Sequence, residues 1–349
     1  MKGLAITDKG LEDISLLEIK ELLKVSGKVV DSGVVFDFKK IDDLYKLCYL
    51  GQSVFKVLNL IDNFSMKNDL IEELKSRVKK IDFSKYLGKG QTFAVRSWHK
   101  KIENSRGEIE GAVGSVIPGK VNLSDPDVVF FVYVYGSDVY FGIDVGGLDL
   151  SEREYKIFSH PNSLKGPVAY GLVRLGWNSK GKLVNYSCKS GEVGIEAALF
   201  GSGKAVNFYS KDKFEFDLEK FDKVKRKKKL DIWCVDSDDR SLSATKKNAK
   251  IAGVSQLVQV SKIKIEDLDV KFKEGEVSCL VGQVFRPEEV DKVKELFYQA
   301  AYILSGKLVI CCYENENFDK LAEEHKFKKT EERMIERGGI KYKVLVFAK

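Results

Sequence analysis

The stretch Asn185–Leu199 reads NYSCKSGEVGIEAAL, and it decides the fold of this chain. A short apolar run, Lys182–Val184, leads into a turn of small residues, and a helix is predicted to begin near Gly194–Ala198. About thirty-five residues after the end of this stretch, a second apolar run ends in VDSDD, Val235–Asp239. A strand, a turn, a helix and a second strand in this order predict the first unit of a parallel sheet.

The rest of the second half continues this alternation of apolar strands and helices. The predicted strands are Lys182–Ser187, Asp231–Val235, Leu257–Ser261, Val277–Val281 and Lys307–Tyr313. Two further runs, Phe327–Glu336 and Ile340–Phe347, flank Arg337–Gly339, which is a hairpin turn signal. We therefore predict that residues 151–349 form a Rossmann-like α/β domain, whose mostly parallel sheet ends in an antiparallel hairpin.

The first half has a different order of elements. Residues 1–64 follow a βαββαβ pattern, which predicts a small ferredoxin-like unit. Residues 65–150 form a second α/β unit, in which Asp127–Tyr135 and Val139–Val145 are predicted to pair as a hairpin. The pattern changes after Gly146–Gly147, so we place a boundary near residue 150.

Composition limits the class of protein. The chain has 349 residues, of which 44% are hydrophobic, so it should fold into large cores. No apolar run approaches the roughly 20 residues that a membrane span needs, and we expect a soluble, cytoplasmic protein. The six cysteines show no CxxC spacing and the three histidines lie far apart, so we expect buried thiols and no metal site.

The net charge of +7 is unevenly distributed. The run Lys220–Lys229, KFDKVKRKKK, holds seven basic residues and one acid. Such a run suits a phosphate backbone through counterion release, and it also suits a solvated surface loop. Both interpretations stay open for this segment alone.

Three segments carry a resemblance to a known family. They are the opening KGLAITDKGLEDISLLEIKELL, the segment TFAVRSWHKKIENSRGEIEGAVGSVI, and the turn NYSCKSGEVGIEAA with WCVDSDDRSLSATKKNA after it. Together they resemble the THUMP-domain RNA methyltransferases, in particular those that methylate guanine N2 in tRNA or rRNA. The resemblance implies S-adenosylmethionine (SAM) as cofactor, structured RNA and most of all tRNA as partner, and the α/β folds predicted above.

A group of basic residues lies in the THUMP-like segment, between a predicted strand and a predicted helix. Its members are Arg96, His99, Lys100, Lys101 and Arg106. A helix N-terminus beside them can also bind phosphate. The family uses this module to hold the 3′ end of tRNA or a comparable RNA end, so we predict that these residues bind RNA. A solvated loop is the alternative, which the matching flanks disfavour.

The SAM turn departs from the family pattern, which reads roughly D-P-x-C-G-S-G-T. Asn185 stands at the acid, Lys189 at the first glycine and Glu192 at the threonine. Glycine is needed there because the cofactor lies directly on the backbone. The residues predicted to hold a weakened SAM site are the matching ones in the turn and at the end of the second strand: Cys188, Ser190, Gly191, Asp236 and Ser237. An acid such as Asp236 hydrogen-bonds the ribose hydroxyls, although Asp238 or Asp239 could simply start the next helix.

The catalytic motif of the family, Asn-Pro-Pro-Tyr/Phe, follows the fourth strand. Its amide and backbone carbonyls accept the protons of the guanine amine, and its aromatic ring stacks on the flipped base. This chain has Gly282, Gln283, Val284 and Phe285 there, so only the aromatic residue matches. A shift of one residue would let Gln283 offer an amide. We identify no catalytic residue in this slot.

These features predict an RNA-binding member of the family that has lost methyl transfer and serves as a binder or as the partner subunit of another protein. The first alternative is a working SAM-dependent tRNA or rRNA methyltransferase with divergent motifs. The second is a Rossmann-like protein that binds a nucleotide or metabolite, which the THUMP-like half argues against.

Overall fold

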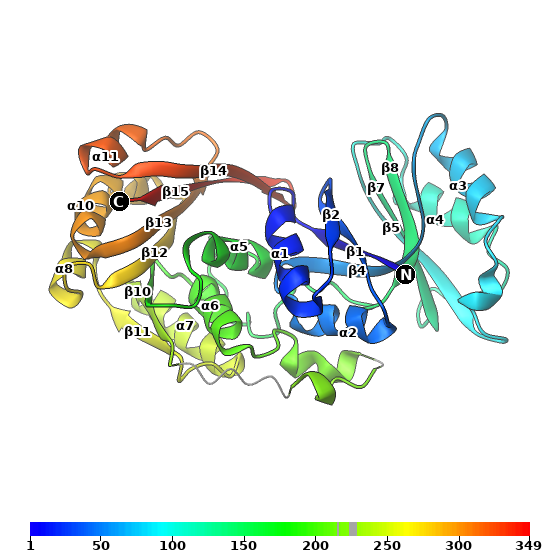
Figure 1. Cartoon of the computed structure of the whole chain (residues 1–349), viewed down its shortest axis with the longest axis horizontal. Helices are drawn as coiled ribbons and strands as arrows, with labels where there is room; N and C mark the ends of the chain where they lie inside the picture. Colours follow the sequence, from blue (N-terminus) through cyan, green and yellow to red (C-terminus); the bar gives the residue numbers. More distant parts are fainter. Residues whose placement is uncertain (215, 223–228) are drawn as a thin grey trace.

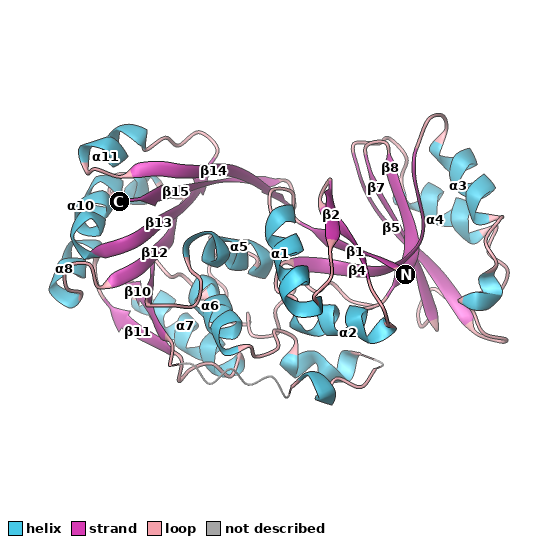
Figure 2. Ribbon diagram, viewed as in Figure 1, coloured by secondary structure: helices cyan, strands magenta, loops and turns pink. Residues whose placement is uncertain are grey.

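The computed structural model describes residues 1–214, 216–222 and 229–349, and in it two sheets carry helices on their faces (Figures 1 and 2). Most of the basic run Lys220–Lys229 therefore lies outside the described residues. Figure 1 shows the second sheet at one end of the molecule, strands β5, β7 and β8 at the other end, and β1–α2 between them.

The first sheet has eight strands in the order β2-β3-β1-β4-β8-β7-β5-β6. The strands are β1 (Lys2–Thr7), β2 (Gly27–Val30), β3 (Gly33–Asp37), β4 (Val54–Ser65), β5 (Thr92–Lys100), β6 (Lys120–Val121), β7 (Val128–Tyr135) and β8 (Asp138–Asp144). The helices are α1 (Glu12–Leu23), α2 (Ile41–Leu50), α3 (Leu70–Val78) and α4 (Arg106–Gly114).

Strand pairing confirms the ferredoxin-like unit. Strand β1 lies between β3 and β4 and pairs antiparallel with both. Helices α1 and α2 pack on this part of the sheet through Ile19, Leu44 and Leu47. Strand β4 also pairs with β8, so the strands before and after the predicted boundary at residue 64 belong to one continuous sheet. The domain boundaries at residues 64 and 150 stay predictions.

Helix α4 begins where the sequence provides a complete cap. The Ser105 hydroxyl accepts the N–H of Glu108, and the Glu108 carboxylate accepts the N–H of Ser105. The buried side chains Ile109 and Val113 then pack on the sheet together with α3. The cap fixes Arg106 at the exposed first turn of the helix.

The second sheet has seven strands in the order β11-β10-β9-β12-β13-β15-β14. The strands are β9 (Lys182–Tyr186), β10 (Asp231–Asp236), β11 (Val258–Lys262), β12 (Val277–Val284), β13 (Leu304–Tyr313), β14 (Lys328–Arg337) and β15 (Ile340–Ala348). The helices are α5 (Gly166–Gly176), α6 (Glu192–Ser202), α7 (Asp239–Ile251), α8 (Leu268–Lys271), α9 (Pro287–Val290), α10 (Val293–Ile303) and α11 (Asp319–Glu324).

Pairing confirms a mostly parallel sheet with an antiparallel ending. Strands β9 to β13 run parallel, whereas β15 is antiparallel to both β13 and β14. Helices α5, α6 and α7 share one apolar core with one face, and α8, α10 and α11 share another with the opposite face. Helices on both faces explain why these strands are apolar along their whole length.

A fully buried polar network joins the two halves. The Glu196 carboxylate on α6 accepts hydrogen bonds from Arg153 Nε at 2.7 Å, from Tyr155 at 2.7 Å and from Gln52 Nε2 at 2.6 Å. Gln52 precedes β4 in the first half, and its carbonyl oxygen accepts a bond from Arg153 Nη2 at 2.7 Å. The buried carboxylate and guanidinium neutralise one another within the second half, and Gln52 ties this pair to the first half.

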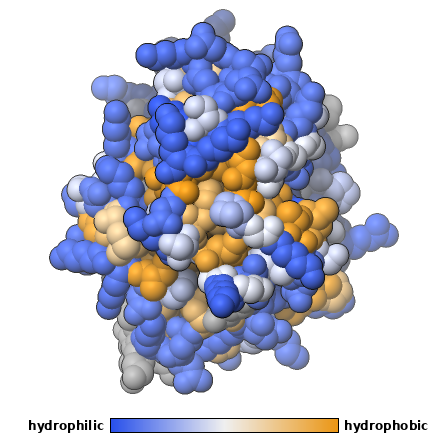
Figure 3. All heavy atoms as spheres, turned by 90° about the vertical axis from the view of Figure 1, so that its right-hand side faces the viewer, coloured by the Kyte–Doolittle hydropathy of each residue, from blue (hydrophilic) through white to orange (hydrophobic). Residues whose placement is uncertain are grey.

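The surface at the end of the molecule formed by the first sheet is mixed. Figure 3 shows apolar side chains gathered in the middle of this face and hydrophilic side chains around them. Within the described ranges, no helix combines the length and the apolar character that a membrane crossing requires.

Candidate functional site

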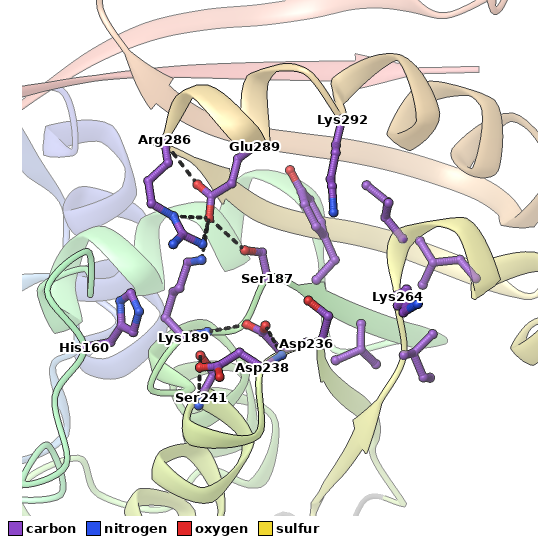
Figure 4. A pocket seen from close by; sticks show the side chains of 16 residues that line it. His160, Ser187, Lys189, Asp236, Asp238, Ser241, Lys264, Arg286, Glu289 and Lys292 are labelled. Carbon is purple, nitrogen blue, oxygen red and sulfur yellow. Dashed lines mark hydrogen bonds and ion pairs between the residues drawn. The ribbon is translucent and has the colours of Figure 1, made fainter.

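A cavity of about 200 Å³ opens at the carboxyl ends of β9, β10 and β11 (Figure 4). In the sheet order, β9 lies between β10 and β12, so the direction of winding reverses here. Open α/β sheets bind their ligands at this kind of reversal. The cavity therefore lies where the fold alone would place a ligand.

Asp236 ends β10 and lies at the floor of the cavity. Its Oδ2 accepts the backbone N–H of Lys189 at 3.2 Å, and its Oδ1 accepts that of Asp238 at 3.0 Å. A carboxylate has about four acceptor positions, so each oxygen keeps capacity for a further donor. Asp238 in turn caps α7 by accepting the N–H groups of Arg240 and Ser241, so Asp236 is the carboxylate available to a ligand.

The turn between β9 and α6 is held in a backbone conformation that favours glycine. Ser187 has φ 50°, Lys189 has φ 54° and Gly191 has φ 87°. Left-handed backbone costs a non-glycine residue roughly 1–2 kcal/mol. A Cβ at Gly191 would lie 2.6 Å from Cγ2 of Thr245, so glycine is required there. The two other positions carry side chains in spite of the strain.

Three of the predicted cofactor residues do not line the cavity. Cys188 is buried against Thr245. The Ser190 hydroxyl lies 2.6 Å from the Ser163 hydroxyl, and it donates a hydrogen bond to Glu192 at 2.7 Å. Gly191 is the N-cap of α6. These residues form the support of the turn, whereas Asp236 and Ser237 face the cavity.

The Lys189 side chain leaves the turn and crosses toward the segment after β12 (Figure 4). It is 2% exposed, and its Nζ lies 2.5 Å from Glu289 Oε1. Arg286 Nη2 reaches the same oxygen at 3.1 Å. Glu289 Oε2 accepts the backbone N–H groups of Phe285 and Arg286 at 2.9 and 3.2 Å. Two cations and one anion therefore occupy this side of the cavity.

The charged groups of this cluster shift the pKa values of the titratable side chains around the cavity. Burial alone would raise the pKa of Glu289, but the Lys189 ammonium and the backbone N–H groups outweigh it and lower this pKa. Burial and then the positive charges of Lys189 and Arg286 lower the pKa of His160, which lies at the rim. Glu289 is thus anionic and His160 neutral near pH 7.

The slot aligned with the catalytic motif has no room for a side chain at its first position. A Cβ built at Gly282 would lie 2.5 Å from Cδ1 of Tyr186 and 2.6 Å from the Tyr186 carbonyl oxygen. Real Cβ contacts are essentially never shorter than 3.0 Å. The Tyr186 ring, which stands at the proline position of the SAM turn, therefore occupies the space of an asparagine side chain at position 282.

The other members of the slot are engaged in packing. Gln283 is buried, and its Nε2 donates to the carbonyl oxygen of Asn162 at 2.7 Å. Phe285 is buried against Tyr313 and Tyr342, with ring centroids 5.0 and 5.6 Å away. Neither the amide nor the ring is free to contact a base.

A second, larger cavity of about 850 Å³ lies between the first sheet and the turn of the β14–β15 hairpin. It brings together three of the five predicted RNA-binding residues, Arg96, Lys100 and Arg106. The aromatic side chains Trp98 and Phe131 also line it. Cations beside aromatic rings are the combination that holds an RNA strand.

The other two predicted residues lie outside this cavity. His99 has a buried Nδ1 without a hydrogen-bond partner among the described residues. Lys101 places its ammonium 4.9 Å from the centre of the Tyr135 ring. The alternation of β5 explains the position of His99, because neighbouring residues of a strand point to opposite faces, whereas Lys101 follows the end of this strand.

The second half of the chain contributes charge to this cavity. Lys100 forms an ion pair with Glu336 of β14, and Arg337 lies 3.1 Å from Asp8 Oδ1. Burial raises the pKa of Asp8 to about 6, against the lowering effect of Arg337. The other oxygen of Asp8 has no partner among the described residues.

Comparison with known proteins agrees with this geometry. A family model described as an RMKL-like methyltransferase domain matches residues 153–343, more than half of the chain. The chain belongs to the RMKL-like methyltransferase family. A THUMP domain model matches residues 69–144, which include β5, α4, β7 and β8.

Curated relatives and solved structures extend over nearly all of this family member. It is 27% identical to the tRNA (guanine(6)-N2)-methyltransferase of Methanocaldococcus jannaschii, over 96% of each chain. It is 24% identical to the protein of the same name from Archaeoglobus fulgidus, over 97% of this chain and 90% of the relative. The crystal structure of TrmN from Thermus thermophilus matches with a TM-score of 0.73 at 18% identity, covering 100% and 99% of the two chains. SMU.472 complexed with SAH matches with a TM-score of 0.79 at 19% identity, covering 99% and 97%.

The cofactor that this family implies is SAM. The nucleoside half of SAM fits the cavity, because Asp236 has acceptor capacity for ribose hydroxyls and the apolar side chains Ile263, Ile265 and Leu268 line the same space. The methionine half does not fit. Lys189 stands at a glycine position of the family pattern, and its buried side chain, paired with Glu289, lines the cavity there.

Three features of the sites could not be predicted from the sequence: the pairing of Glu289 with Lys189, the position of the Tyr186 ring, and the place of Arg337 in the larger cavity. Glu289, the partner of Lys189, has one local signal, an acid three residues after Arg286 whose carboxylate accepts the N–H of that residue at the start of a short helix. The position of the Tyr186 ring over Gly282 depends on the pairing of β9 with β12, which no local pattern reveals. The hairpin turn signal at Arg337 gives no sign that this residue lines the larger cavity.

Proposed function

We propose that this member of the RMKL-like methyltransferase family binds structured RNA, with tRNA as the first class to test, and that it does not transfer methyl groups by itself. RNA binding rests on the THUMP match and on the cations and aromatic rings that line the larger cavity. The names of the relatives from Methanocaldococcus jannaschii and Archaeoglobus fulgidus favour tRNA over other RNAs.

One observation carries the loss of methyl transfer. The Tyr186 ring fills the space above Gly282, so the motif position that presents an amide to the guanine amine can hold no side chain. Because Phe285 is buried among aromatic side chains, a flipped base has no ring to stack on.

The RNA part of the proposal is tested with full-length protein and a tRNA transcript. The double variant Arg96→Ala/Lys100→Ala should lose roughly tenfold in affinity, and the salt slope should fall by about one unit for each phosphate contact removed. Lys320→Ala, on the distant helix α11, is the matched control and should leave both unchanged. An unchanged affinity in the double variant would refute the THUMP-side interface.

The enzymatic part is tested with methyl-labelled SAM and bulk tRNA. We expect no label in tRNA above the level without protein. Label at guanine N2 would instead establish the alternative, a working methyltransferase with divergent motifs, which the position of Asp236 favours. A partner subunit that supplies methyl transfer stays a prediction, and label that appears only after a cell extract is added would support it.

A further inference from the structure

The most buried acids of the larger cavity are already neutralised by cations. Asp144 forms an ion pair with Lys56, and Asp8 forms one with Arg337. These buried pairs leave little free charge in the interior of the cavity. The interior therefore suits an uncharged part of an RNA, which is a base.

The cations nearer the surface of this cavity suit the phosphates of an RNA. Arg106 is exposed, and the Arg96 guanidinium keeps its charge while it donates to two carbonyl oxygens, at 2.6 and 3.3 Å. The Lys100 side chain is 40% exposed and its partner Glu336 27% exposed. Exposed ion pairs stabilise a protein little, so Lys100 can exchange Glu336 for a phosphate.

Three aromatic side chains line the larger cavity, and cations already cover two of the rings. Arg337 Cζ lies 4.8 Å from the centre of the Phe55 ring, and Lys56 Nζ lies 5.5 Å from the centre of the Phe131 ring. Trp98 is half-buried, and among the described residues no cation lies over its ring. The Trp98 ring is therefore the aromatic surface that a ligand can reach.

Neighbouring side chains hold the Trp98 ring in one orientation. The fully buried Tyr133 of β7 stacks on it, with ring centroids 5.2 Å apart and planes inclined by 18°. Phe55 lies beside it, with centroids 6.4 Å apart. The Tyr133 hydroxyl is itself fixed, because it donates to the carbonyl oxygen of Asp31 at 3.3 Å. A ring held in this way loses little conformational freedom when a flat ligand stacks on it.

The indole N–H of Trp98 also differs from those of the other two tryptophans. Trp177 Nε1 donates to the carbonyl oxygen of Gly181 at 3.3 Å, and Trp233 Nε1 donates to Asp231 Oδ1 at 2.8 Å. The N–H of Trp98 has no acceptor among the residues that the structure describes. A tryptophan N–H that is removed from water usually has an acceptor, so a ligand that fills the cavity has to supply one.

We propose that Trp98 stacks on an unpaired base of the bound RNA and thereby selects RNAs that present one. The proposal rests on the RNA binding proposed above. The indole N–H donates to the same nucleotide, and Arg96, Lys100 and Arg106 hold the neighbouring phosphates. In a duplex each base is already stacked between its neighbours, so its faces are closed to the ring.

The first test compares a single-stranded RNA of about twelve nucleotides with a blunt duplex of the same sequence, using full-length protein. The single strand should bind at least tenfold more tightly. Trp98→Leu should lose about tenfold in affinity for the single strand and leave the duplex unchanged, whereas Trp98→Phe keeps a ring and should stay within about threefold of the unmodified protein. Trp233→Phe is the matched control. Equal binding of the two RNAs by the unmodified protein would overturn the proposal.

Tryptophan fluorescence tests the stacking contact itself. The double variant Trp177→Phe/Trp233→Phe leaves Trp98 as the only tryptophan of the chain. Its emission should fall when the single strand is added, because a base then lies on the ring. The emission of Trp98→Phe, which comes from the two other tryptophans, should not change. An unchanged Trp98 emission at saturating RNA would refute the contact, and this result does not depend on the folding of Trp98→Leu.

Failure of this proposal can be distinguished from failure of the proposed function. If tRNA binds while the single strand and the duplex bind equally, RNA binding stands and the role of Trp98 is wrong. If neither tRNA nor either short RNA binds, both proposals are wrong.

Discussion

Lys189 in the smaller cavity and Arg106 in the larger one are cations in opposite environments. In the smaller cavity Lys189 is almost fully buried and paired with Glu289, whereas in the larger cavity Arg106 is exposed at the first turn of α4. A buried ion pair is part of the fold, because removing either member leaves an uncompensated charge. An exposed cation retains its hydration and is available to a phosphate. A basic residue in a motif therefore indicates function only when its burial and its partner are known.

Removing the anion of the smaller cavity should have the largest effect. Glu289→Ala leaves Lys189 buried without its counter-ion, so the free energy of unfolding should fall by about 3–5 kcal/mol. Urea denaturation followed by circular dichroism measures this change. The double variant Lys189→Gly/Glu289→Ala removes both charges and should recover much of the loss. If Glu289→Ala alone is as stable as the unmodified protein, the pair is not structural and the comparison fails.

Removing a cation that the second half of the chain contributes to the larger cavity should weaken RNA binding. Arg337→Ala should reduce tRNA affinity about tenfold, or roughly 1.4 kcal/mol, because it removes a cation that lines the same cavity as Arg96, Lys100 and Arg106. Filter binding at fixed salt measures the effect, with Lys320→Ala as control. If Arg337→Ala binds tRNA as tightly as Lys320→Ala does, the RNA interface lies in the first half of the chain alone.

The Tyr186 hydroxyl provides a smaller test of the closed catalytic slot. It is buried and has no hydrogen-bond partner among the described residues. Tyr186→Phe removes this unsatisfied group and keeps the ring over Gly282, so the free energy of unfolding should rise by about 1 kcal/mol. A loss of stability would show that the hydroxyl is hydrogen-bonded in solution.

The smallest effect should come from pH. Asp8 has a pKa raised to about 6 by burial, and it faces Arg337, Asp149 and Glu12. As the pH falls from 7 to 5.5, Asp8 gains a proton and Arg337 loses its counter-charge, so the larger cavity becomes more positive. The tRNA affinity should increase two- to threefold, about 0.4–0.7 kcal/mol. Asp8→Asn should remove this step, and an identical pH profile in that variant would assign the step to another group.

The fold could be predicted from the sequence because its signals are periodic. Alternating apolar runs and helices predict the second sheet, and the βαββαβ order predicts the ferredoxin-like unit; both follow from local patterns. The end of β10 predicts Asp236, because a strand end fixes the position of the next side chain. The structure places Asp236 in the smaller cavity.

The candidate sites could be predicted only in part because their remaining members meet across the sheet. Lys189 and Glu289 are 100 residues apart, and the Tyr186 ring reaches Gly282 through the pairing of two parallel strands. The β14–β15 hairpin brings Arg337 to a cavity lined by β5. Parallel strands that are far apart in the sequence bring such residues together, and no local sequence pattern predicts that these side chains are close in space.

The network around Glu196 has a consequence for how the molecule melts. Because Gln52 bonds to both members of the buried Arg153–Glu196 pair, unfolding the first half would leave this pair without two of its hydrogen bonds and open it to water. The two halves should therefore lose their structure in one calorimetric transition. A ligand bound in either cavity then raises a single shared melting temperature. A chain cut at residue 150 would lose the Gln52 side of this junction and keep Arg153 and Glu196.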